Sequence, residues 1–272
     1  MSTTTQVCAS GSGRSPLDIP PPPPLKMGWR RAFRAMRQLF DNPDDTEKAI
    51  EFFYSIGRRE FERNFRRFVA SPAGRTLLAE RPSIAALLSD RERLSRMPEG
   101  SFGRAYLEFL ERHGFQAMGI LELQLRVEAR WEEEDGLPRL DDARAWFRER
   151  SVLAHDLHHV LTSYGTDDVG EATLLAFTLA QAPGRGQAIL TVGAALQVRR
   201  SLGWRWLLYD FRAWYRGRRA NRLAAVAWED LLPLRLETAR NLLGIAPLED
   251  VHPHGVLSGS RDGNGGLALC SP

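Results

Sequence analysis

The sequence has few cysteines, few lysines and no long hydrophobic run. Among its 272 residues only Cys8 and Cys270 are cysteines, and they lie near opposite ends of the chain. This excludes a disulfide scaffold and a Cys-rich zinc or iron–sulfur site. The longest nearly apolar stretch, 188–198, has about half the length of a bilayer span, which excludes a transmembrane helix. The N-terminus lacks the apolar core of a secretory signal, so we expect an intracellular protein.

The charge is almost balanced, with 37 basic and 34 acidic residues and a net charge of +3 at pH 7. Nearly all the basic residues are arginines, because Lys26 and Lys48 are the only lysines. Mixed charge without a basic stripe or a known motif argues against a dedicated nucleic-acid-binding protein. We therefore expect no nucleic-acid partner, and the arginine-rich usage favours a bacterial origin over a mitochondrial one.

The composition along the chain predicts one helical domain between two loose tails. Residues 1–26 contain Ser, Thr, Gly and five consecutive prolines, which is typical of polyproline II or disorder. Residues 250–272 contain Gly and Ser without a period, and we expect a flexible tail there. Residues 27–249 show apolar spacings of three and four, which predicts an all-α domain. The main expected helices lie at 46–70, 102–113, 118–134, 141–164, 168–181, 187–202, 204–218, 220–232 and 233–243.

The most informative segment is His155-Asp-Leu-His-His159, which contains three of the six histidines. On a helix His155, Asp156 and His159 share an arc of about 100°, while His158 points away from it. Imidazoles at i and i+4 can bind one ion at about 2.0–2.1 Å, with a carboxylate oxygen added. Glu171, in the first turn of the next helix, can return over this face if the two helices are antiparallel. The sequence therefore predicts a metal site of His155, Asp156, His159 and Glu171.

Each of these residues also has another interpretation. A helical histidine is most often a surface or hydrogen-bonded core residue, and Glu171 follows Asp168 by three, as in a capping box. The zinc peptidase motif HExxH has Glu where Asp156 stands, and Asp is one methylene too short to serve well as its general base. The His-Asp doublet of HD-type phosphohydrolases would add His113 upstream, but no clear downstream Asp completes it. An unrelated metal hydrolase therefore stays an alternative.

The spacing His155-Asp156-x-x-His159, eleven residues and then Glu171 resembles the signature of a family of coenzyme Q (ubiquinone) biosynthesis proteins, the fourth in the yeast-derived naming. Ser163 stands where the family has Gly in its Thr-Gly-Tyr flank. The resemblance covers roughly residues 28–248. Further similar segments lie at 98–106, 159–165, 228–230, 233–234 and 240–245.

The resemblance implies an all-α fold and a bound divalent metal, usually taken as zinc. Iron, manganese and cobalt suit the same donors. It implies His155, Asp156, His159 and Glu171 as ligands and provides no separate catalytic base. The implied activity is that of a metal-dependent carboxy-lyase, which removes the ring carboxyl of a polyprenyl hydroxybenzoate precursor and installs a hydroxyl at the same carbon. The alternative is a non-catalytic, lipid-binding scaffold that organises the enzymes of ubiquinone synthesis.

The resemblance also implies partners and a location. The expected partners are a polyprenylated quinone precursor, other ubiquinone-biosynthesis proteins, the membrane surface and a second copy of the chain. We expect a cytoplasmic protein on the inner membrane of a bacterium, or a protein on the matrix side of the mitochondrial inner membrane if the source is eukaryotic.

Two apolar stripes with nearby arginines could contact lipid. The first is Trp29, Phe33, Met36 and Phe40, beside Arg30, Arg31, Arg34 and Arg37. The second is Trp204, Leu208, Phe211 and Tyr215, near Arg212, Arg216, Arg218 and Arg219. Core packing is the commoner role for such a stripe, but we expect one of the two to contact the membrane.

Overall fold

The computed structural model describes residues 19–22, 27–42 and 45–252. These residues form fifteen α-helices and one short 3-10 helix and contain no β-strand, which confirms the all-α prediction. Residues 1–18, 23–26 and 253–272, where most of the two predicted tails fall, lie outside the described residues. The helices are α1 (Trp29–Asp41), α2 (Thr46–Ile56), α3 (Arg58–Ala70), α4 (Pro72–Glu80), α5 (Ile84–Ser89), α6 (Arg91–Ser95), α7 (Phe102–His113), α8 (Gly119–Asp135), α9 (Asp142–Thr162), α10 (Asp168–Gln181), α11 (Arg185–Leu202), α12 (Arg205–Arg219), the 3-10 helix Leu223–Ala225, α13 (Trp228–Leu231), α14 (Leu236–Leu243) and α15 (Leu248–Val251).

Two of the expected helices are interrupted in the structure. The helix expected over 46–70 is divided at Gly57, where a side-chain carbon would stand 2.4 Å from the backbone oxygen of Phe53. The helix expected over 220–232 is reduced to two single turns, because the chain there extends to close over the core. Helices α7 and α10 have the predicted bounds.

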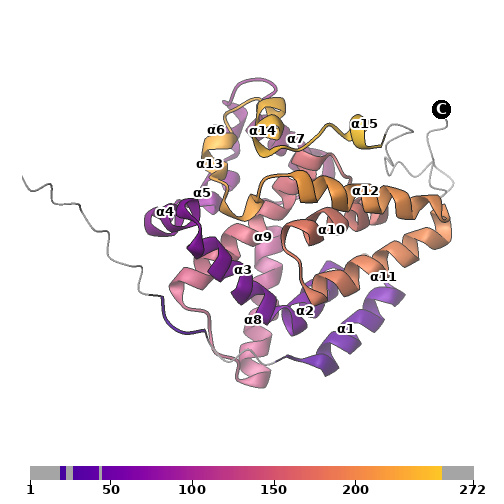
Figure 1. Ribbon diagram of the computed structural model, residues 1–272. Coiled ribbons are helices and arrows are strands. Elements are labelled where there is room, and N and C mark those ends of the chain that lie inside the picture. Colours follow the sequence, from indigo (N-terminus) through magenta and orange to yellow (C-terminus); the bar gives the residue numbers. More distant parts are fainter. Residues whose placement is uncertain (1–18, 23–26, 43–44, 253–272) are drawn as a thin grey trace, which may run out of the picture.

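Helix α9 lies at the centre of the molecule, with α3 and α4 on one side and α10 and α12 on the other (Figure 1). Its apolar face, which includes Leu153, Leu157 and Leu161, is fully buried in the largest core cluster. Its other faces carry arginines that are paired with carboxylates of neighbouring elements. Arg150, for example, donates to both oxygens of Glu229 at 2.7 and 2.8 Å. These pairs fix α9 in position against the surrounding helices.

The C-terminal end of α9 is held by two arginines from later in the chain. Arg240 donates to the carbonyl of Leu161 at 2.8 Å, and Arg216 donates to the carbonyl of Thr162 at 2.7 Å. The last carbonyls of a helix have no partner within the helix, so donors from outside stabilise its end. Ser163 follows in the left-handed conformation with φ +60°. Glycine is the usual residue at this position.

Parts of the two expected tails pack against the domain where the structure describes them. Ile19 packs against the cluster around Phe65, and the carbonyl of Pro20 accepts a hydrogen bond from Arg144 at 3.2 Å. At the other end α15 reaches Val251, and the ring of His252 is buried beside Tyr209. The domain therefore continues beyond residue 249.

The two apolar stripes differ in their exposure. Trp204, Leu208, Phe211 and Tyr215 are all at least half exposed, so core packing does not explain the second stripe. In the first stripe Trp29 and Phe33 are exposed, whereas Met36 packs against the cluster between α1 and α2, and the side chain of Phe40 lies outside the described part. No helix among the described residues is both long and apolar enough to span a bilayer.

Candidate metal centre

A tight corner between α9 and α10 brings the predicted site residues together. Asp167 caps α10, since its carboxylate accepts from the amide of Gly170 at 3.3 Å. Gly170 lies directly against the backbone of Gly165, and a side-chain carbon on Gly170 would stand 2.1 Å from the Gly165 oxygen. This close approach turns the chain sharply enough for the first turn of α10 to face the last turns of α9. Glu171 is thereby placed opposite the two histidines.

The structure directs the carboxylate of Glu171 toward the two imidazoles. Its Oε1 lies 3.2 Å from Nε2 of His159, and its Oε2 lies 3.8 Å from Nε2 of His155. One donor atom from each of the three residues lies within 4.8 Å of the other two. Donors that share a tetrahedral ion at about 2.0–2.1 Å are separated by about 3.3 Å. The two distances from Glu171 to the imidazoles are close to this value, whereas the three donor atoms together span up to 4.8 Å.

The capping-box interpretation of Glu171 does not hold. The helix is capped by Asp167 and not by Asp168, so Glu171 occupies the fourth helical position instead of the third. A capping box needs Glu at the third position to reach the amide of the cap residue. The carboxylate of Glu171 contacts the histidines instead.

His159 has the hydrogen-bonding state that a metal ligand needs. Its Nδ1 lies 3.1 Å from the carbonyl oxygen of Tyr164, and because a carbonyl only accepts, Nδ1 carries the proton. When the ring carries only this proton, its lone pair is on Nε2. That atom is buried and has no hydrogen-bond partner among the described residues, although it faces the Glu171 carboxylate. A lone pair directed at a carboxylate in a buried place is unfavourable unless a proton or a cation lies between them.

Asp156 lies on the other side of the His155 ring. Its Oδ1 is 3.5 Å from Nδ1 of His155, whereas Nε2 of the same ring faces Glu171. The structure thus brings together three of the four predicted ligands and places the fourth beside the remote nitrogen of one of them. A carboxylate in that position orients a metal-binding imidazole and raises its basicity.

The other histidines near the site have different surroundings. The ring of His158 points to Trp228, at 5.8 Å between centroids, and burial lowers its pKa to about 3, so it is neutral. His113 lies at the edge of the site, where its Nδ1 is 3.1 Å from the hydroxyl of Thr166. The ring of Phe109 stacks on His159 at 5.8 Å and excludes water from that side.

The carboxylates and imidazoles of the site shift one another's pKa values. Burial raises the pKa of Glu171, but the two imidazoles outweigh this effect and the pKa is lowered. Burial lowers the pKa of His155, but Asp156 and Glu171 outweigh it and the pKa is raised. The side chain of His159 is 1% exposed, whereas those of His155 and Glu171 are 36% and 41% exposed. One side of the donor set is therefore closed, and the other is open to a ligand.

The donor set fits a divalent metal. Two imidazole nitrogens and one carboxylate oxygen leave a position for water or substrate, as in catalytic zinc sites. The buried Nε2 of His159 without a partner is the observation that supports this fit.

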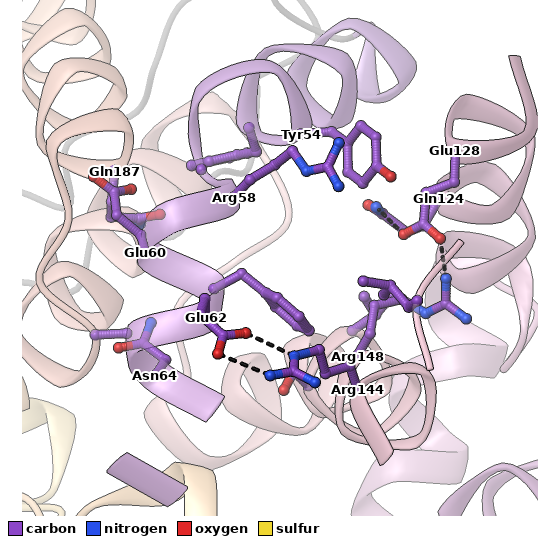
Figure 2. Close-up of a pocket in the computed structure, with 17 residues that line it drawn as sticks. Tyr54, Arg58, Glu60, Glu62, Asn64, Gln124, Glu128, Arg144, Arg148 and Gln187 are labelled. Atoms are coloured by element: carbon purple, nitrogen blue, oxygen red, sulfur yellow. Dashed lines mark hydrogen bonds and ion pairs between the residues drawn. The ribbon is translucent and has the colours of Figure 1, made fainter. Parts of the chain in front are cut away.

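A cavity begins one helical turn before His155, and it was not anticipated from the sequence. It has a volume of about 370 Å³ and lies between α2, α3, α8 and α9 (Figure 2). Ser151 and Val152 of α9 line it, on the same helix face as His155. The residues that form it come from distant parts of the chain, so no spacing in the sequence indicates it.

Known proteins resemble this chain in sequence and in fold. A model of the family described as "Coenzyme Q (ubiquinone) biosynthesis protein Coq4" matches residues 42–249, which include all four predicted ligands. The chain belongs to the Coq4 family. Membership of this family supports a role in ubiquinone biosynthesis.

Curated relatives in the Coq4 family are named as mitochondrial proteins. The ubiquinone biosynthesis protein COQ4 of Pyricularia oryzae is 30% identical over 186 residues, 67% of this chain and 56% of its own length. The homolog from Danio rerio is 32% identical over 125 residues, 46% of this chain and 40% of its own length. The chain thus spans little more than half of the first of these relatives and less than half of the second. A crystal structure from Nostoc punctiforme has the same fold, with a TM-score of 0.60 and 17% identity over 81% of this chain and 99% of that one.

Proposed function

We propose that this chain is a metal-dependent enzyme of ubiquinone biosynthesis that acts at the carboxyl-bearing ring carbon of a polyprenyl hydroxybenzoate. The carrying observation is the buried Nε2 of His159, which has no hydrogen-bond partner among the described residues and faces Glu171 at 3.2 Å. Membership of the Coq4 family supports the pathway. The site supports the metal, because a cation between these two groups removes the repulsion of a lone pair by a carboxylate.

His155, His159 and Glu171 would hold the ion, with zinc as the first candidate and iron, manganese or cobalt as alternatives. When bound, the ion would supply a Lewis acid for a phenolate or carboxylate oxygen of the substrate. The chain's own groups fix the geometry. The Tyr164 carbonyl holds the His159 proton on Nδ1, Asp156 orients His155, and Phe109 keeps water from one side.

The proposed reaction breaks the bond between the ring carbon and the carboxyl group and releases carbon dioxide. A new carbon–oxygen bond forms at the same ring carbon, which is a two-electron oxidation of the ring. We name dioxygen as the oxidant. It accepts the two electrons and, with two protons, leaves as hydrogen peroxide, while water supplies the new hydroxyl oxygen. Zinc is redox-inert, so with zinc bound the electron-rich phenolate itself would donate to dioxygen.

The test replaces Glu171 in a strain that depends on this chain for ubiquinone. We expect Glu171→Gln to abolish ubiquinone and to accumulate a carboxylated polyprenyl phenol, measured by mass spectrometry of extracted lipids. The control is Glu122→Gln on α8, where the glutamate is exposed, and it should make ubiquinone normally. Normal ubiquinone with Glu171→Gln would refute the proposal.

The same experiment separates the enzyme from the scaffold alternative. In a scaffold the ion would only brace α9 against α10. Glu171→Gln should then lower the helical signal in circular dichroism or release the other enzymes of the pathway, and no carboxylated intermediate would accumulate. Retained fold and retained partners together with the intermediate favour the enzyme.

The exposed faces of α11 and α12 support a peripheral membrane contact. The stripe Trp204, Leu208, Phe211 and Tyr215 is exposed, and Ile189, Val192 and Leu196 form a second exposed stripe on the adjoining α11. Exposed arginines flank them at Arg205, Arg218 and Arg219. An apolar face bordered by arginines fits an anionic lipid surface. A place on the inner membrane is therefore proposed, mitochondrial if the source is eukaryotic, as the names of the relatives suggest.

Vesicle sedimentation tests the membrane contact. With vesicles of anionic phospholipid we expect the double variant Leu208→Gln, Phe211→Gln to bind at least tenfold more weakly than the wild type. The control is Leu125→Gln, an exposed leucine of α8, which should bind like the wild type. Equal binding of all three proteins would contradict the proposal.

A further inference from the structure

The cavity between α2, α3, α8 and α9 has aromatic walls and a charged lining. Its volume of about 370 Å³ is within the range of small-molecule sites. Phe53, Tyr54 and Phe61 supply the aromatic surface, and Leu140 and Val152 add aliphatic surface. Six charged side chains also line the cavity, and their pairing decides what ligand it can take.

Five of these six charges already have partners. Glu62 accepts from Arg144 at 2.7 and 2.9 Å, and Glu128 is paired with Arg148. Glu60 accepts from backbone amides at the start of α11. Dashed lines in Figure 2 mark the first two of these pairs. The carboxylates of the lining are therefore occupied.

Arg58 is the one charged residue of this lining whose side chain has neither a hydrogen-bond nor an ion-pair partner among the described residues. Arg58 is buried, with 6% of its surface exposed, and its Nη1 has no hydrogen-bond partner among the described residues. No carboxylate of the described residues lies within ion-pair distance of it. Its guanidinium lies over the ring of Tyr54, 5.7 Å from the guanidinium carbon to the ring centroid. Figure 2 shows its guanidinium directed toward the cavity, beside Tyr54.

A buried guanidinium without an anion is costly, and proteins usually pair such a charge. Here the anion can come from a ligand. A guanidinium binds a carboxylate through two parallel hydrogen bonds, and the neighbouring aromatic walls suit a ring attached to it. Glu128 interacts with Arg58 through space, but its carboxylate is taken by Arg148. A ligand anion is thus the partner that the cavity admits.

We propose that this cavity binds an aromatic carboxylate and that Arg58 recognises its acid group. This inference deepens the proposed function and rests on it for the identity of the natural substrate, a ring that carries a carboxyl group. Ser151 and Val152 line the cavity one turn of α9 before His155, a rise of about 6 Å. The cavity therefore reaches α9 about one turn from His155 and shares none of the candidate ligands. Arg58 is a specificity-determining residue for the acid end of the substrate.

The test compares 4-hydroxybenzoate with its neutral analogue 4-hydroxybenzamide by isothermal titration calorimetry on the full chain. The wild type should bind the acid at least tenfold more tightly than the amide. In Arg58→Gln this ratio should fall to about one, and Arg58→Lys should recover part of it. The control is Arg59→Gln, because Arg59 is the exposed neighbour on α3, and it should keep the wild-type ratio.

Folding is monitored by thermal unfolding. Arg58→Gln removes an unpaired buried charge, so its Tm without ligand should be no lower than that of the wild type. The comparison of acid and amide in the unaltered wild type stands even if a variant unfolds. Equal affinity of the wild type for acid and amide, or an unchanged ratio in Arg58→Gln, would overturn the inference.

Glu171→Gln separates this inference from the proposed function. If Arg58 holds the acid group, Glu171→Gln keeps the acid-to-amide ratio. If the ratio is lost in Glu171→Gln and kept in Arg58→Gln, the acid binds at the metal centre, and the inference fails while the proposed function stands. If Glu171→Gln supports normal ubiquinone synthesis and Arg58 still sets the ratio, the proposed function fails and the binding site stands.

Discussion

Replacing Asp156 with asparagine tests the arrangement of the metal centre most directly. The Oδ1 of Asp156 lies 3.5 Å from Nδ1 of His155, while Nε2 of that ring faces Glu171 at 3.8 Å. If Asp156 only orients the ring, its loss weakens metal binding by about 10–100-fold, the usual effect of a carboxylate behind a ligating histidine. This corresponds to about 1.4–2.7 kcal/mol. If Asp156 binds the ion directly, its loss should equal the loss of a ligand.

The assay is a Zn²⁺ titration of the metal-free protein in competition with a chromophoric chelator. Asp156→Asn should bind 10–100-fold more weakly than the wild type, and Glu171→Gln should bind more weakly still. The control is Asp142→Asn, an exposed aspartate in the first turn of the same helix, which should match the wild type. Circular dichroism checks that each variant keeps its helices.

Two results would refute this account of the site. If Asp156→Asn and Glu171→Gln lose the same affinity, Asp156 is itself a ligand and the bound state differs from the arrangement described. If Asp156→Asn binds zinc like the wild type, the carboxylate contributes nothing to the orientation of His155.

Three further predictions concern stability. Ser163→Gly should be about 1–2 kcal/mol more stable than Ser163→Ala in urea unfolding. Both variants lose the hydroxyl that accepts a hydrogen bond from Arg240, but only glycine relieves the strain of the left-handed backbone at φ +60°. Equal stabilities of the two variants would contradict this. Glu62→Gln should cost about 1.5–3 kcal/mol, because the buried Arg144 loses its bidentate charged partner and keeps only Asp141. Thermal unfolding should show a Tm lower by roughly 3–12 °C. A shift below about 2 °C would mean that the pair contributes little. Burial raises the pKa of Asp210 from 3.8 to about 7. Between these pH values the folded protein keeps a proton that the unfolded chain has lost, so the free energy of unfolding should fall as the pH rises. Asp210→Asn should remove this pH dependence, and an unchanged pH dependence would show that other groups cause it.

The predictable parts of the fold are those that depend on neighbours in the sequence. Helices α7 and α10 were predicted at their observed bounds, because cap residues and breakers lie at both ends of each. The division at Gly57 was missed, although a glycine inside a helical pattern is a signal for it. The irregular chain after α12 was also missed, since residues 220–232 have the composition of a helix and their extended path depends on packing over the core.

The candidate site divides in the same way. That His155 and His159 share one face of a helix follows from the α-helical period alone. Which carboxylate joins them could not be decided from that period, because Asp156 and Glu171 are both plausible donors in sequence. The side of the His155 ring on which each lies depends on the corner at Gly165 and Gly170.

The amino-acid sequence by itself determined the helical class, the two imidazoles on one helix face and the family, because each rests on residue types at short, regular spacings. Only the tertiary structure decided that Glu171 faces the histidines and that Arg58 is buried without an anion. The physical reason is that pairing among buried charges depends on which helices pack together. That packing brings together residues far apart in the chain, and no local pattern encodes their distances.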